Sequence, residues 1–184
     1  NSMADTRKLA TATLLGVAIA VVKGPLQPPY ADFLIIVEAP ILGLSFLLLG
    51  RGGATYTELV NGLLQSTVKA SFFPFSLVAA LLYGLQVDFF GSVFRAGRGD
   101  SASSKRMIAA LGLSSITTGI IAAYTSISLG IVQYSPSLFF YIYIPIIIWG
   151  VLSGSLGGFL ATLIWERNLK ARFRPLQRAV SQAS

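Results

Sequence analysis

The chain has 184 residues, of which 54% are hydrophobic and 11% are charged, and its mean hydropathy is +0.71. Soluble domains carry about 25% charged residues, so the composition predicts an integral membrane protein. The chain contains no Cys and no His, which excludes disulfides, thiol chemistry, Cys/His zinc sites and imidazole acid–base catalysis.

Six apolar segments follow one another along the chain. They are bounded by polar or Gly/Pro-rich stretches, and they cover residues 9–22, 33–49, 54–68, 72–94, 107–131 and 138–165. A helix needs about 20 residues to cross a bilayer, so the chain has room for six crossings. We therefore predict an all-α integral membrane protein in which residues 1–184 form one bundle of six transmembrane helices.

Three further stretches lie outside these segments. Residues 1–6 are expected to be a leading segment, in which Asn1 and Ser2 look like an expression remnant ahead of a start methionine, Met3. Residues 95–106 form a polar loop, and residues 166–184 form a basic tail. We expect both stretches on the cytoplasmic side.

The basic residues indicate the orientation. With six crossings both termini share one side, and twelve of the fourteen Lys and Arg residues fall there: Arg7, Lys8, Arg51, Arg95, Arg98, Lys105, Arg106, Arg167, Lys170, Arg172, Arg174 and Arg178. The other side holds Lys23 and Lys69. Because cytoplasmic loops carry the excess of Lys and Arg, we predict that both termini are cytoplasmic in a multi-pass protein of a prokaryotic plasma membrane. Attraction to anionic lipid explains the tail better than binding to nucleic acid.

Polar residues within the apolar segments are the candidate functional residues, since they are costly in lipid and usually face an interior or a cavity. Glu58, Asn61 and Gln65 share one stripe of a helix, and Asp88 lies at similar depth on the next segment. These four form a predicted intramembrane polar cluster, either structural or functional, in which Glu58 and Asp88 can share a proton or a basic partner. Glu38 lies about 7 Å below the outer boundary, where a solute from outside can reach it.

Aromatic residues gather on the predicted outer side. Gln133, Tyr134 and Tyr141, with Phe139 and Tyr143, can stack a flat ring and hydrogen-bond its edge, although interfacial aromatic residues also serve as membrane anchors. In the first segment, Ala12, Gly16 and Ala20 form a small-residue stripe that permits close approach of another helix. The sequence has no G-x-x-x-x-G-K-[ST], H-E-x-x-H or G-x-S-x-G motif, so nothing in it predicts ATP hydrolysis, a metal, a cofactor or a nucleophile with its base.

The chain resembles the substrate-binding S components of energy-coupling factor (ECF) vitamin transporters, and most closely their hydroxymethylpyrimidine/thiamine branch. The likeness rests on "TRKLATATLLGVAIAV", on "VEAPILGLSFLLLGRGGA", on Glu58 with Gln65 in the third segment, on "YGLQVDFF", on Tyr134-Ser135-Pro136 and on "WGVLSGSLGG". Departures at Gln65, Tyr83 and Ile146, and the lack of an Asn-Pro turn after the third segment, leave the identity of the vitamin open.

The resemblance implies a high-affinity binding subunit rather than an enzyme. It would take up a thiamine-related vitamin or precursor from outside, and it would work with a transmembrane coupling subunit and two ABC ATPase subunits. We expect the ligand to contact Glu38, Tyr83, Gln86, Tyr124, Gln133, Tyr134 and Tyr141, and the stripe of Ala12, Gly16 and Ala20 to dock the coupling subunit. A small membrane enzyme, a partner-independent solute carrier and a structural membrane protein are the alternatives.

Overall fold

The computed structural model of the protein describes residues 2–26, 34–68, 74–97, 102–128 and 136–171, and in these residues it contains helices and turns but no strand. The elements in chain order are α1 (Ser2–Lys23), α3 (Ile35–Leu49), α4 (Gly53–Val68), α5 (Phe75–Val93), α6 (Ser104–Ser128), α7 (Pro136–Ile164) and the π-helical turn η2 (Trp165–Leu169). Each of the six apolar segments coincides with one α-helix, which confirms the prediction of an all-helical protein built on six helices.

Three helix ends lie farther out than the apolar segments predict. α1 begins at Ser2, α6 begins at Ser104, and the last helix continues through η2 to Leu169. Hydropathy marks where a segment is apolar, whereas a helix also continues through Arg, Lys, Glu and Ala because these residues have high helix propensity. The end of the predicted 95–106 loop and the start of the predicted 166–184 tail are therefore helical.

Three helices are long and apolar enough to cross a membrane: α5, residues 104–125 of α6, and residues 140–169 of α7 and η2. α3 is apolar but has only 15 residues, and α4, with 16 residues, carries the polar stripe. Large hydrophobic side chains are exposed on the outer faces of the helices, including Phe89 and Phe159, which are 63% and 52% exposed. Extended apolar surface of this kind is typical of a membrane or protein interface, and the structure is consistent with a helical membrane protein.

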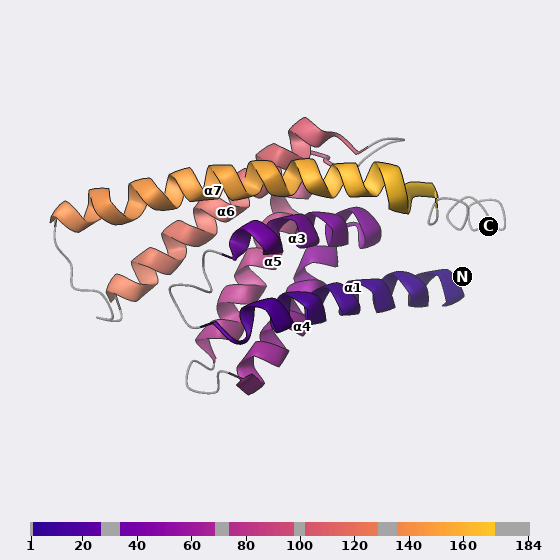
Figure 1. The fold of residues 1–184 in the computed structure, drawn as a ribbon, viewed down its shortest axis with the longest axis horizontal. Coiled ribbons are helices and arrows are strands. Elements are labelled where there is room, and N and C mark those ends of the chain that lie inside the picture. The colour runs from indigo at the N-terminus through magenta and orange to yellow at the C-terminus, as the bar shows by residue number, and fades with distance from the viewer. Residues whose placement is uncertain (1, 27–33, 69–73, 98–101, 129–135, 172–184) are drawn as a thin grey trace.

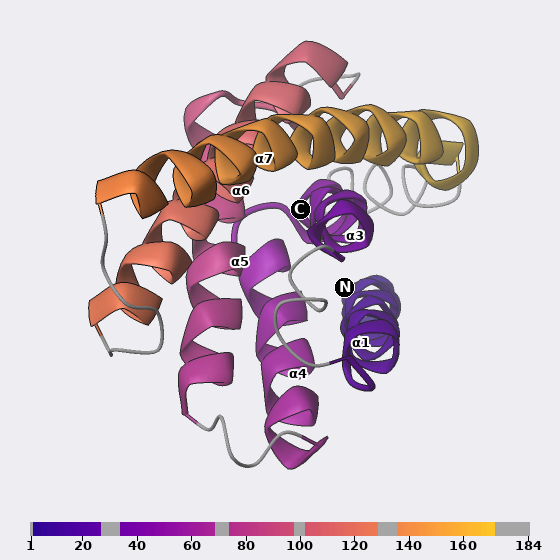
Figure 2. The ribbon, with the colours of Figure 1, turned by 60° about the vertical axis from the view of Figure 1, so that its left-hand side comes forward.

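The helices are not aligned along one common axis. Figures 1 and 2 show α4 beside α5 and α6 beside α7, with α3 enclosed between α7 and the α1–α4 side. In both views α4 and α5 cross the direction of α7. α1 begins and α7 ends at the same end of the molecule, the right-hand end of Figure 1.

α6 and α7 approach each other closely because glycines lie at their crossing. A Cβ atom added at Gly154 would lie 2.3 Å from the Cα atom of Gly112, and one added at Gly158 would lie 2.5 Å from the Cα atom of Ile108. No side chain fits at either position, so the helix backbones themselves are in contact. Small residues commonly permit this kind of packing between membrane helices.

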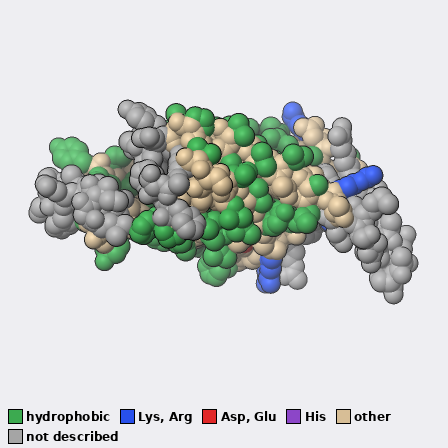
Figure 3. Space-filling view, turned by 90° about the horizontal axis from the view of Figure 1, so that it is seen from below, with side chains coloured by type: hydrophobic (Ala, Val, Ile, Leu, Met, Phe, Trp, Pro, Cys, Tyr) green, Lys and Arg blue, Asp and Glu red, His purple; other side chains and the backbone are tan. Residues whose placement is uncertain are grey.

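The interior contains both an apolar core and buried polar groups. Its apolar cluster is drawn from five helices and the turn after α5, and it consists of Ile19, Leu42, Phe46, Ala54, Tyr83, Val87, Ala96, Met107 and Leu111. The outer surface is largely hydrophobic. On the face shown in Figure 3, Lys and Arg side chains lie in the half of the molecule where α1 begins and α7 ends.

Candidate functional site

A buried ion pair joins the end of α1 to the first turn of α3. The Nζ atom of Lys23 donates a hydrogen bond to Oε2 of Glu38 at 2.7 Å, and the two side chains are 16% and 4% exposed. α1 ends at Lys23 because Gly24 and Pro25 follow it, which places the ammonium group beside the next helix. Glu38 is therefore enclosed and paired with Lys23 in this structure, and its contact with a solute from outside stays a prediction.

The polar stripe of α4 forms a chain of hydrogen bonds inside the protein. Gln65 donates through Nε2 to Oδ1 of Asn61 at 2.7 Å, and Asn61 donates through Nδ2 to Oε2 of Glu58, also at 2.7 Å. All three side chains are buried. The residues lie three and four positions apart, which stacks them on one face of a helix. The stripe thus faces other helices, as the cost of exposing such groups to lipid requires.

The ion pair and the α4 stripe meet at the centre of the molecule. The carboxyl groups of Glu38 and Glu58 are within hydrogen-bonding reach of each other, and Lys23 also interacts electrostatically with Glu58. Tyr83 of α5 interacts electrostatically with the same two carboxyl groups, and its hydroxyl lies 2.9 Å from Oγ of Ser115 on α6. We call Lys23, Glu38, Glu58, Asn61 and Gln65 the central polar network.

One carboxylate oxygen of the central polar network lacks a hydrogen-bond donor. Oε1 of Glu58 is buried, and no donor among the described residues reaches it. A carboxylate ordinarily accepts several hydrogen bonds through its two oxygens, and a buried polar atom without a partner is uncommon. This oxygen is therefore the point in the network at which a further atom can bind.

Asp88 has a separate role at the start of α4. Its Oδ1 atom accepts from the backbone N–H of Ala54 at 3.2 Å, and its Oδ2 atom accepts from the N–H and the hydroxyl of Thr55 at 2.8 and 2.5 Å. The first N–H groups of a helix have no partner within the helix, and a negative charge there also complements the helix dipole. Asp88 thus caps α4 from α5. The prediction that Asp88 forms a cluster with Glu58 is corrected accordingly. Arg51, a basic residue shortly before α4 that could have been their partner, is exposed.

The five predicted substrate-binding residues that the structure describes do not gather in one place. Glu38 and Tyr83 are buried in the centre, whereas Tyr124 and Tyr141 are 67% and 79% exposed. Gln86 lies partly buried between α5 and α6. Gln133 and Tyr134 lie outside the described residues. Tyr124 and Tyr141 occupy outward faces of long apolar helices, where side chains of this type serve as interfacial anchors.

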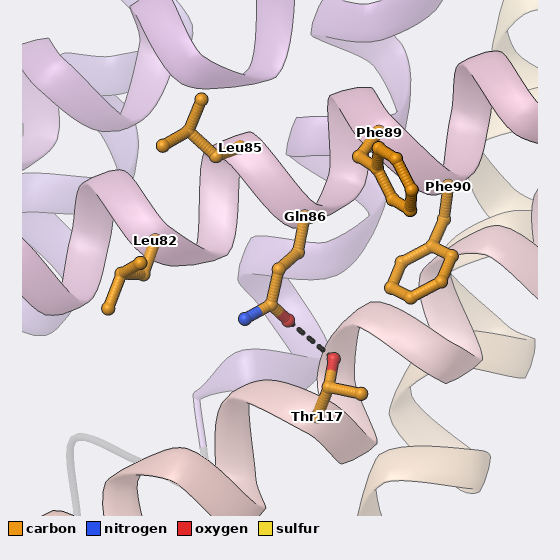
Figure 4. A pocket seen from close by; sticks show the side chains of 6 residues that line it. All are labelled: Leu82, Leu85, Gln86, Phe89, Phe90 and Thr117. Atoms are coloured by element: carbon orange, nitrogen blue, oxygen red, sulfur yellow. Dashed lines mark hydrogen bonds between the residues drawn. The ribbon is translucent and has the colours of Figure 1, made fainter.

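Gln86 is part of a groove between α5 and α6 with a volume of about 340 Å³, lined by Leu82, Leu85, Gln86, Phe89, Phe90 and Thr117. The carbonyl oxygen of Gln86 accepts hydrogen bonds from the hydroxyls of Thr117 and Thr118, at 2.5 and 3.0 Å. Figure 4 shows the Gln86 side chain reaching from α5 toward Thr117, with the leucines and phenylalanines arranged along α5. The groove offers apolar contacts, one amide and a hydroxyl, and none of its lining residues is charged.

The small-residue stripe of α1 lies against α4. Ala12 is fully buried, and a Cβ atom at Gly16 would lie 2.7 Å from the carbonyl oxygen of Thr57 and 2.8 Å from Cβ of Val60. Thr57 also donates to the carbonyl oxygen of Ala12 at 3.4 Å and to Ser45 at 2.8 Å. In this structure α4 therefore occupies the face of Ala12 and Gly16, and Ala20 is half-buried. Docking of a partner along this stripe stays a prediction.

Three residues that take part in these interactions were not among the candidates from sequence. Lys23 was assigned only to orientation, although it lies 15 residues before Glu38 across a short Pro-rich connection, and this proximity was the available signal. Thr117 and Thr118 gave no signal, because threonines in apolar helices commonly bond to their own backbone.

The chain matches no known family model, and neither the curated proteins nor the solved structures include a significant match to it.

Proposed function

We propose that the protein is the membrane-embedded substrate-binding subunit of an importer, with six crossings and both termini in the cytoplasm. Support for the location comes from the three long apolar helices and the exposed hydrophobic surface. The orientation is favoured by the placement of Lys and Arg in the half of the molecule where α1 begins and α7 ends (Figure 3), since basic residues concentrate on the cytoplasmic side.

The observation that carries the proposal is the central polar network. Charged and amide side chains inside membrane helices are expensive, and they usually mark a pathway or a binding site. Here Lys23, Glu38 and Glu58 are gathered where four helices meet, at the end of α1 that faces outward in the proposed orientation. A polar organic solute that enters from this side would have to open the Lys23–Glu38 ion pair, and it would then exchange its hydrogen bonds with water for bonds to these groups.

The class of solute and the partners follow from the sequence resemblance to ECF S components. A thiamine-related compound, such as hydroxymethylpyrimidine or thiamine, offers ring nitrogens and an amino group that suit carboxylate and amide partners. In this proposal a transmembrane coupling subunit and two ABC ATPase subunits supply the energy. The groove beside Gln86 and the interfacial tyrosines would contribute apolar contacts.

Ligand-dependent thermal stability of the purified full chain tests the proposal. A ligand present at 100 times its dissociation constant stabilises a protein by about 2.7 kcal/mol, so thiamine or hydroxymethylpyrimidine is expected to raise the melting temperature measurably. Glu38→Gln should weaken this stabilisation, and Glu166→Gln, which changes a carboxylate at the other end of the molecule, should leave it unchanged.

Two results would contradict the proposal. One is the absence of stabilisation by any thiamine-related compound. The other is solute uptake into liposomes that contain only this chain, because a substrate-binding subunit needs its partners for transport.

A further inference from the structure

We propose that Lys23, Glu38 and Glu58 form a buried site that binds one exchangeable proton, held by Glu58 and shared with Glu38. This inference concerns the protein without any solute, and it does not depend on the proposed import function. The ligand is the proton itself. The site is built from three helices, since α1 contributes Lys23, α3 contributes Glu38 and α4 contributes Glu58.

The charges of the three groups do not balance without a proton. Lys23 forms an ion pair with Glu38 at 2.7 Å, with the Glu38 side chain 4% exposed. If Glu58 were also ionised, a second negative charge would lie fully buried beside the first. Two neighbouring carboxylates cannot both remain ionised at low cost, and an uncompensated buried charge is strongly unfavourable. One proton makes the trio neutral.

The hydrogen bonds place the proton on Glu58. Its Oε2 atom accepts from Asn61 at 2.7 Å, and Asn61 is itself oriented by the bond from Gln65. No donor among the described residues reaches Oε1. A protonated carboxyl group has an O–H donor and needs an acceptor, and the carboxylate of Glu38 lies within hydrogen-bonding reach. Glu38 in turn already accepts from Lys23, so it is the ionised member of the pair.

Among the described residues, one further titratable group interacts with the site and does not change this balance. Tyr83 from α5 interacts electrostatically with both carboxyl groups, and its hydroxyl bonds to Ser115. Asp88, the other buried carboxylate of α5, is engaged with Ala54 and Thr55 at the start of α4. Loss of the proton would therefore leave one unpaired negative charge in the interior.

Infrared spectroscopy of the full chain in lipid nanodiscs tests the site directly. The protein has three glutamates, Glu38, Glu58 and Glu166, so glutamate labelled with ¹³C at the side-chain carboxyl gives a spectrum with three contributors. We expect the carbonyl stretch of one protonated glutamate at neutral pH, and we expect it to disappear as the pH is raised. Absence of this band in the wild-type protein at neutral pH would overturn the proposal without any variant.

The same infrared band in four variants then tests how many protons the site holds and which group holds them. Glu58→Gln removes the group that holds the proton, and Glu38→Gln leaves Glu58 as the counter-ion of Lys23, so each should abolish the band. Lys23→Met removes the positive charge and should double the band, because both carboxyl groups then take a proton. Glu166→Gln should leave it unchanged. A band that survives both Glu58→Gln and Glu38→Gln would contradict the assignment, and loss of the wild-type band on addition of Na⁺ at constant pH would show that a cation, not a proton, is the ligand.

Discussion

Two pairs of packed helices, α4 with α5 and α6 with α7, are held together by different kinds of contact. Where α4 meets α5, the carboxylate of Asp88 accepts hydrogen bonds from Ala54 and Thr55. Where α6 meets α7, the backbone at Gly154 lies directly against Gly112, with no side chain between them. The first contact depends on hydrogen bonds from N–H groups to a carboxylate, whereas the second depends on the small size of glycine, which has no side chain. A chain with only 11% charged residues thus places charge where a helix terminus is enclosed and uses glycine where helix surfaces cross.

The largest effect is expected from adding one methyl group at the α6–α7 contact. In Gly154→Ala the new Cβ atom would lie 2.3 Å from Cα and 2.4 Å from the backbone nitrogen of Gly112, and neither atom can move alone. Overpacking of this kind costs typically 1–3 kcal/mol, and contact with backbone predicts about 3 kcal/mol or more. Equilibrium unfolding in detergent micelles measures the loss.

The matched control for this variant is on the facing helix. Gly112→Ala places its Cβ atom in open space, so its stability should stay within about 1 kcal/mol of wild type, with any change in the stabilising direction expected for Gly→Ala in a helix. Equal losses from Gly112→Ala and Gly154→Ala would mean that the two backbones do not meet in this way.

A smaller effect is expected where α4 meets α5. Asp88→Ala leaves the N–H groups of Ala54 and Thr55 without their acceptor, and loss of a helix cap or of a charged hydrogen-bond partner costs about 1–3 kcal/mol. Asp88→Asn should lose less, because the amide oxygen still accepts. Hydrogen exchange at Ala54 and Thr55 should become faster in Asp88→Ala. Unchanged exchange at both amides would show that Asp88 does not cap the helix.

The smallest expected effect is the difference in coupling energy between two residue pairs that both include Glu58. The double-mutant cycle with Glu58→Met and Asn61→Leu should show a coupling of about 0.5 kcal/mol or more, because the two side chains belong to one buried hydrogen-bond network. The corresponding cycle with Glu58→Met and Asp88→Asn should be additive within about 0.5 kcal/mol, because the two carboxyl groups share no hydrogen-bond partner. Coupling in the second cycle and additivity in the first would show that Glu58 interacts with Asp88 rather than with Asn61.

Sequence reasoning succeeds where one local property determines the outcome. The six helices follow from hydropathy, and the inward orientation of Glu58, Asn61 and Gln65 follows from their spacing on α4 together with the cost of polar groups in lipid. Both inferences need only neighbouring residues. The boundaries are less accurate, as at Ser2 and Ser104, because helix formation does not require apolar residues.

Partner choice between helices is harder to predict because it depends on how the helices cross. The stripe of Ala12 and Gly16 indicates that another helix approaches, but the sequence does not say that this helix is α4 rather than a separate subunit. In the same way, the position of Asp88 along α5 suits a partner of Glu58, yet its carboxylate accepts hydrogen bonds from Ala54 and Thr55 at the start of α4. Depth along a helix can be read from sequence, whereas rotation about the axis is fixed by packing.

The contact between Asp88 and the first turn of α4 has a consequence for membrane insertion. α4 has 16 residues and carries Glu58, Asn61 and Gln65, so it is poorly suited to enter a bilayer by itself. α5 is the next helix along the chain, and it is long and apolar enough to cross a membrane. It also carries Asp88, whose carboxylate accepts hydrogen bonds from backbone N–H groups at the start of α4. In a protein that spans the membrane as proposed, we therefore expect α4 and α5 to insert together as a hairpin, because α5 supplies both the apolar length and the hydrogen-bond acceptor that α4 lacks.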